Sequence, residues 1–200
     1  VSHQSVDLLV LSGTEPNLKW RAIASELAAL ASTVEVARVI SLGAVPAAVP
    51  HTRPTPIMVT SDDPNTPSVG LPEGTFTVPG AIVNVIGHQL RRETNTTDVG
   101  FWAQIPHYVS GEYWPGTVAL LQRVSSTLGL EVDIEDMSRT ADEQRSRLDA
   151  ATNERPEARA YVQRLEEISG GAINPMSADQ PGEEIEEFLR SLGDEDNPFQ

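Results

Sequence analysis

The side chains best suited to chemistry in this sequence come directly after predicted strands, in three separate loops. Parallel α/β sheets bind their ligands at the carboxyl ends of the strands, so the three loops are expected to share one edge of a sheet. A carboxylate can accept a proton, an imidazole titrates near neutral pH, and a guanidinium holds a carboxylate or phosphate through two hydrogen bonds. The candidate catalytic residues, without an assigned role, are Glu15, His51, Arg53, His107 and Tyr108.

Each candidate also has a simpler structural interpretation, and the sequence leaves both open. If His51 and His107 converge, they would form an acid–base pair or two ligands of a metal ion. The alternative is a hydrogen-bonded structural pair. Glu15 suits the positive end of a helix, and the prolines around His51 and Arg53 suit a rigid turn whose polar groups bond to loop carbonyls.

Motifs for nucleotide binding and nucleophilic catalysis are missing from the chain. It contains no G-x-x-x-x-G-K-[ST], G-x-G-x-x-G, G-x-S-x-G or H-E-x-x-H. Lys19 is the only lysine, so a lysine-anchored phosphate site or Schiff base has a single candidate. We therefore predict neither a cofactor nor a metal ion, and we favour a non-enzyme while leaving catalysis open.

The elements predicted to position these loops begin with a strand, a helix and a second strand. Residues 6–11 form a continuous apolar run, typical of a strand buried on both faces. A helical stripe from Trp20 to Ala31 follows, and the next strand is predicted over 34–42 with Gly43 at its end. This order predicts a parallel pair with a right-handed crossover. Because such an opening strand usually follows an earlier βα unit, we expect the chain to begin inside a larger protein.

The segment 43–80 is rich in proline and glycine, which removes backbone donors and bars long helices. Periodicity predicts four further elements before residue 130: a strand at 57–60, a helix at 80–93, a strand at 99–105 and a helix from Pro115 that stops at Gly129. Residues 1–130 are therefore predicted to form an α/β core, a layered and mostly parallel sheet flanked by helices.

After the α/β core, the pattern becomes that of helices packing on helices. Residues from Ile134 to Ala151 recur at spacings of three and four, and a second arm follows Pro156. Residues 131–169 are therefore predicted to form a helical hairpin, and 170–200 a linker, a short acidic helix and a disordered end. The apolar side chains of that short helix are candidate partner-binding residues: Ile185, Phe188, Leu189 and Leu192.

The net charge of −15 is concentrated at the C-terminal end. Residues 1–130 carry 10 acidic and 7 basic side chains, whereas residues 131–200 carry 19 and 7. Such a field repels nucleic acid and anionic lipid and favours basic protein surfaces. The chain has no cysteine, which excludes a disulfide framework, and no apolar run long enough to span a bilayer. We therefore expect a soluble protein, with the cytoplasm as the default compartment.

Three loop motifs carry a family resemblance. They are G-x-E-P-x-L-x-W from Gly13, P-H-T-R-P from Pro50, and Ile105-Pro106-His107-Tyr108. In order and approximate spacing they resemble the bacterial branch of the proteasome assembly chaperone family of the second type, over about residues 6 to 165. The resemblance implies an α/β core similar to the nucleoside phosphorylase fold, a C-terminal helical extension, and a family member that starts well before Val1.

Two functions follow as hypotheses. The resemblance implies a protein-interaction or assembly-factor domain of uncharacterised physiological role, with protein partners related to the proteasome and with self-association. Archaeal relatives dock through a C-terminal hydrophobic–tyrosine–any-residue motif, and this chain ends in Pro198-Phe199-Gln200 without a tyrosine. The alternative is an enzyme on a phosphorylase-like or ligase-like scaffold, with the five candidate residues lining its site.

Overall fold

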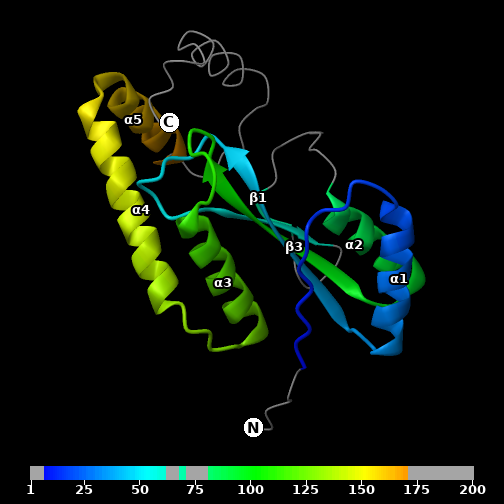
Figure 1. Cartoon of the computed structure of the whole chain (residues 1–200). Helices are drawn as coiled ribbons and strands as arrows, with labels where there is room; N and C mark the ends of the chain where they lie inside the picture. The colour runs from blue at the N-terminus through cyan, green and yellow to red at the C-terminus, as the bar shows by residue number, and fades with distance from the viewer. Residues whose placement is uncertain (1–6, 62–67, 71–80, 171–200) are drawn as a thin grey trace. The chain divides into compact units, whose positions relative to one another are not determined.

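The computed structural model describes residues 7–61, 68–70 and 81–170, and its elements are labelled in Figure 1. The chain divides into two compact units. The first comprises Val1–Ala37 and Val78–Thr96, and the second comprises Arg38–Thr77 and Thr97–Gln200. The domain boundaries predicted from the sequence, at residues 130 and 169, do not coincide with the borders of these two units. The predicted division into domains therefore stays a prediction.

The first unit contains two helices that pack on each other, α1 (Trp20–Thr33) and α2 (Ile82–Glu93). Both were predicted, within two residues of their ends. The buried residues of α1 are all small, namely Ala24, Ala28 and Ala31. Small side chains at a helix interface allow the two backbones to approach closely.

Residues 7–11 do not form the predicted opening strand. They have no regular structure, and Leu8, Leu9, Val10 and Leu11 are 58%, 70%, 82% and 71% exposed. A strand buried on both faces needs hydrogen-bonded neighbours, and none of the described strands pairs with this run. The predicted parallel pair between this run and the next strand is therefore wrong, because an apolar run does not by itself supply the partner that it requires.

The second unit contains a sheet whose described strands lie in the order β1-β3-β2. β3 is central, parallel to β1 and antiparallel to β2, so a parallel arrangement holds for one of the two pairs. The strands predicted at 57–60 and 99–105 are confirmed. The bounds are Arg38–Ala47 for β1, Ile57–Ser61 for β2 and Thr97–Pro106 for β3.

Gly43 lies inside β1 and does not end it, so the prediction of a strand at 34–42 was placed too early. Gly43 pairs with Trp102 of β3, and a Cβ added at Gly43 would come closer than 3.0 Å to carbons of the Trp102 ring. The same ring lies close to Gly100, and its Nε1–H donates to Thr60 Oγ1 at 3.0 Å. A glycine inside a strand often marks such a close approach.

The core of the second unit lies between the sheet and α3 (Trp114–Leu128). Three strand residues at its centre are almost completely buried: Val59, Val99 and Phe101. Leu120 and Val124 of α3 pack against them. The predicted stop at Gly129 is confirmed, since its φ of 65° is a left-handed conformation that glycine adopts without strain.

The C-terminal part of the second unit is the predicted helical hairpin, α4 (Glu135–Glu154) and α5 (Pro156–Gly170). Figure 1 shows α4 running alongside both α3 and α5, and both pairs of helices are in contact. Gln144 is a polar residue in the predicted seam. Its Oε1 accepts the Trp114 N–H at 2.8 Å, and its Nε2 donates to the Glu112 carbonyl at 2.8 Å. It therefore holds α4 to the first turn of α3.

Replacing Gly43 with alanine is expected to lower the free energy of unfolding by about 1–3 kcal/mol, because the new methyl group must displace the Trp102 ring. Gly13→Ala is the matched control. The space around Gly13 is open, and a less flexible unfolded chain should leave its stability unchanged or slightly higher. Urea unfolding measures both variants, and equal stabilities would contradict the close approach at Gly43.

Candidate functional site

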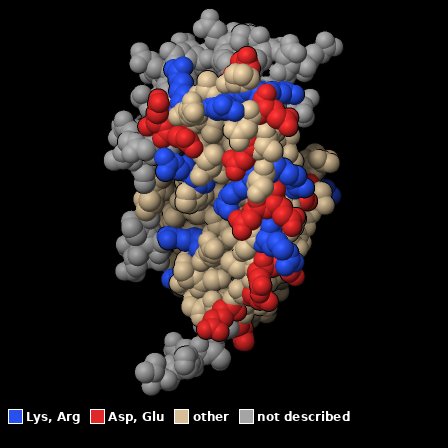
Figure 2. All heavy atoms as spheres, turned by 90° about the vertical axis from the view of Figure 1, so that its left-hand side faces the viewer, with Lys and Arg blue, Asp and Glu red and all other residues tan. Residues whose placement is uncertain are grey.

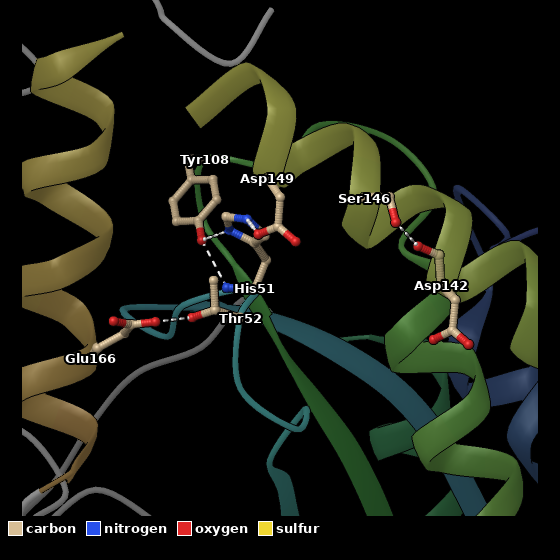
Figure 3. Close-up of polar contacts among 7 residues, drawn as sticks. All are labelled: His51, Thr52, Tyr108, Asp142, Ser146, Asp149 and Glu166. Carbon is tan, nitrogen blue, oxygen red and sulfur yellow. Dashed lines mark hydrogen bonds and ion pairs between the residues drawn. The ribbon is translucent and has the colours of Figure 1, made fainter. Parts of the chain in front are cut away.

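His51 lies in the loop between β1 and β2, and it is completely buried, with 0% of its surface exposed. Tyr108, just after β3, places its hydroxyl against this residue. The His51 backbone N–H donates to Tyr108 Oη at 2.8 Å, and Nδ1 of the ring lies 2.7 Å from the same oxygen. Nε2 lies 3.2 Å from Oδ1 of Asp149 on α4. Figure 3 shows the imidazole held between the phenol and the carboxylate.

These contacts assign the protons of the ring. A carboxylate only accepts, so Nε2 carries the hydrogen that is donated to Asp149. Nδ1 of the neutral ring is then an acceptor, and the hydroxyl of Tyr108 donates to it while accepting the His51 backbone N–H. Both ring nitrogens of His51 are thus engaged in hydrogen bonds within the protein.

The pKa shifts of His51 and Tyr108 are those of a structural hydrogen-bonded pair rather than of a catalytic dyad. Burial lowers the pKa of His51 from its ordinary value of 6.5, against a weaker opposing effect of Asp149. Burial also raises the pKa of Tyr108, against a weaker effect of the hydrogen bond from His51. An Asp–His–Tyr line has the order of a nucleophilic triad, but an activated nucleophile must lose its proton readily. Here the phenol is harder to ionise than a free tyrosine.

His107 belongs to the same cluster. Its Nδ1–H and its backbone N–H both donate to the Ala47 carbonyl, at 3.1 and 3.2 Å. Nε2 is therefore an acceptor, and the Tyr161 hydroxyl of α5 donates to it at 2.8 Å. The rings of His51 and His107 each meet Tyr108 edge-on, with centroid distances of 5.8 and 5.6 Å. The two histidines both contact Tyr108, and the hydrogen bonds of each ring go to other groups of the protein.

The α4–α5 hairpin covers this edge of the sheet. Val162 and Leu165 of α5 are 4% and 1% exposed and form a cluster with Tyr108. Glu166 of α5 accepts a hydrogen bond from the Thr52 hydroxyl, next to His51. A solute cannot touch the His51 ring while the hairpin stays in place, so the strand ends do not form an open site.

The remaining two candidates, Arg53 and Glu15, do not join this network. Arg53 is exposed on the loop that carries His51. Glu15 belongs to the first unit, where its Oε1 accepts the Ile82 N–H at 2.7 Å. Glu15 therefore lies at the start of a helix, as its structural interpretation predicted. The helix is α2 rather than the helix that follows Glu15 in sequence.

The hairpin contributes three residues to the network that the sequence analysis did not predict as site residues: Asp149, Tyr161 and Glu166. Tyr161 gave a usable signal, since a tyrosine on the apolar face of a helix needs a partner for its hydroxyl. Burial raises the pKa of Tyr161 to about 12, so this hydroxyl stays a donor. The two acidic residues gave no signal, because carboxylates are common on solvated helix surfaces.

Within the described ranges, no group of three or more His, Asp or Glu residues could hold a metal ion. In the same part of the chain, every helix is too short or too polar to cross a membrane.

Comparison with known proteins decides the family. The model of the PAC2 family matches residues 1–152. The chain belongs to the PAC2 family. The resemblance carried by the three loop motifs is thereby confirmed.

Three of the solved structures similar to this PAC2 chain come from bacteria. A protein of unknown function from Mycobacterium tuberculosis is 29% identical, with a TM-score of 0.73 over 80% of this chain and 56% of its own. One of unknown function from Corynebacterium glutamicum is 31% identical, with a TM-score of 0.70 over 78% and 58%. A proteasome-assembly chaperone homologue from M. tuberculosis is 33% identical, with a TM-score of 0.65 over 75% and 64%.

This PAC2 chain therefore spans between 56% and 64% of the length of these three proteins. No functionally curated protein matches it.

Replacing Tyr108 with phenylalanine tests the central bridge. The change leaves the backbone N–H and Nδ1 of His51 without their partner inside the protein, so the free energy of unfolding should fall by about 1–3 kcal/mol. The control is Thr52→Val, which breaks an exposed hydrogen bond to Glu166 and should cost less than about 1 kcal/mol. If chemical denaturation finds Tyr108→Phe no less stable than Thr52→Val, the bridge does not hold the strand ends.

Proposed function

We propose that this chain is a protein-interaction domain of an assembly factor and that it performs no acid–base chemistry at its strand ends. One observation carries the proposal. The polar residues there bond to one another and to the α4–α5 hairpin, and His51 is 0% exposed. A catalytic base must reach a substrate proton directly or through one water. The buried imidazole, already bonded at both nitrogens, does not meet this requirement.

Family membership supports the same function. The PAC2 match covers residues 1–152, and one relative, 33% identical over 75% of this chain, is a proteasome-assembly chaperone homologue. We therefore propose proteins as the partners, with proteasome subunits first among them. The family resemblance also leads us to infer a nucleoside-phosphorylase-like core and self-association, and the composition of the chain favours a cytoplasmic location.

The proposed partner-binding surface is the acidic C-terminal segment. Residues 171–200, which lie outside the described part of the chain, carry 8 acidic and 1 basic side chains. The excess of acidic over basic side chains is smaller on α4, which carries 6 acidic and 3 basic side chains. Figure 2 shows acidic and basic side chains interspersed there, and Asp136 pairs with Arg139, as Asp142 does with Arg145. Attraction for a basic partner would therefore come mainly from the end of the chain, with four apolar anchors: Ile185, Phe188, Leu189 and Leu192.

Native mass spectrometry of the purified chain with the proteasome α and β subunits of its own organism tests this function. A complex is expected with the full chain, and removal of residues 171–200 should weaken it by about tenfold or more, since the charge and the apolar anchors are lost together. Circular dichroism checks that the shortened chain keeps its helices. If the full chain stays free at every subunit concentration, these partners are wrong, and equal binding by both chains would exclude the acidic segment.

The His51→Asn variant separates an assembly factor from an enzyme. Because the ring faces the interior, partner binding at neutral pH should stay within about twofold of the wild type. If the chain is instead an enzyme whose base is His51, turnover of its substrate should fall by about 10²–10⁴-fold in this variant. Any turnover that depends on His51 in this way would overturn the proposal.

A further inference from the structure

The hairpin is fastened to the strand ends by polar contacts that converge on two loops. Asp149 of α4 meets His51, and Glu166 of α5 meets Thr52 one residue later. On the same side, Tyr161 of α5 bonds to His107. We propose that the His51 contact is an acid-sensitive clasp, in which protonation of the imidazole loosens the α4–α5 hairpin from the loops beneath it. This inference does not depend on the proposed assembly function.

The geometry of the hydrogen bonds makes protonation unfavourable while the hairpin is in place. Nδ1 of His51 is the acceptor for the Tyr108 hydroxyl, so a proton added there would face a hydrogen that already points at the ring. The hydroxyl would have to rotate and give up its donor role toward His51 while Tyr108 lies packed against Val162 and Leu165 of α5, with 4% of its surface exposed to water. The backbone N–H of His51 bonds to the same oxygen, so the loop and the phenol cannot readjust independently.

Charged groups on the surrounding elements do not reverse this preference. From α4, Asp149 favours the protonated ring, and from α5, Glu166 does so more weakly. The other titratable groups at the cluster include His107 and Tyr108, which follow β3, Tyr113, which precedes α3, and Tyr161 of α5. Arg164 acts on Tyr161. Burial outweighs the two carboxylates, so the pKa of His51 is lowered in the closed form.

The direction of the pH effect follows from this difference. In an open form the ring would meet water and titrate near its ordinary value of 6.5. The closed form binds the proton less readily than the open form. The stability of the closed form relative to the open form is therefore greatest above pH 6.5 and declines as the pH falls below that value. Between pH 7.5 and pH 5.5 the open fraction should rise by up to about tenfold, the ratio expected when only the open form takes the proton.

The absence of cysteine from the chain provides a direct test. Val162→Cys places a single thiol on the buried face of α5, and Val99→Cys places one in the sheet core. The parent residues are 4% and 1% exposed. The labelling rate of each folded variant is divided by its rate in denaturant at the same pH. We expect this ratio to rise severalfold, and by no more than about tenfold, for Val162→Cys from pH 7.5 to pH 5.5 and to stay constant for Val99→Cys. A constant ratio at both positions, or a parallel rise at both, would overturn the clasp.

Two further substitutions separate titration from mere packing. In the Val162→Cys chain, His51→Asn should remove the pH dependence, because the amide does not titrate. Asp149→Asn keeps an acceptor for Nε2–H but removes the charge that favours the imidazolium, so the rise of the ratio on acidification should come closer to the tenfold limit than in the parent. If both changes alter the rate without altering its pH dependence, His51 is only a packing residue. If His51→Asn fails to fold, the Asp149→Asn result decides alone.

Discussion

The arrangement of the second unit depends on one oxygen atom, Oη of Tyr108. It accepts the backbone N–H of His51 and donates to the imidazole of the same residue, and the parallel pairing of β1 and β3 brings the two loops to one edge. Because the Asp149 carboxylate only accepts, Nε2 of the ring carries the hydrogen, and Nδ1 is left to accept from Tyr108. A strand-end loop, a helix and the order of the sheet are thus connected through a single hydroxyl group.

The cluster illustrates how residue types associated with catalysis can serve architecture. A buried polar group is costly unless its hydrogen bonds are made, and both ring nitrogens of His51 and of His107 have partners. A fully bonded network favours one arrangement of the elements that supply it. The same bonding removes the free lone pair or acidic hydrogen that a reaction would require.

The helices were predicted well from the sequence, because their signals are local: the spacing of apolar residues, and for α3 also Pro115 in the first turn and Gly129 at the end. The sequence prediction failed where a residue depends on a distant neighbour. The run 7–11 has the composition of a buried strand, yet no described strand pairs with it, and Gly43 looked like a stop because the Trp102 ring that needs the space lies on another strand. At the candidate site, His51, His107 and Tyr108 were identified from their chemistry, but Glu15 and Arg53 lie outside the network. The hairpin carboxylates produced no local sequence pattern that would have revealed them.

Synthesis on the ribosome imposes an order on these contacts. Asp149 lies 98 residues after His51, and Glu166 lies 114 residues after Thr52. The chain emerges from its N-terminal end at about 5–20 residues per second, so the strand-end loops leave the exit tunnel several seconds before the helices that cover them. During that interval His51 and Tyr108 would be solvated. A nascent chain of this kind therefore exposes the polar groups of its strand-end loops to water until the last helix has emerged.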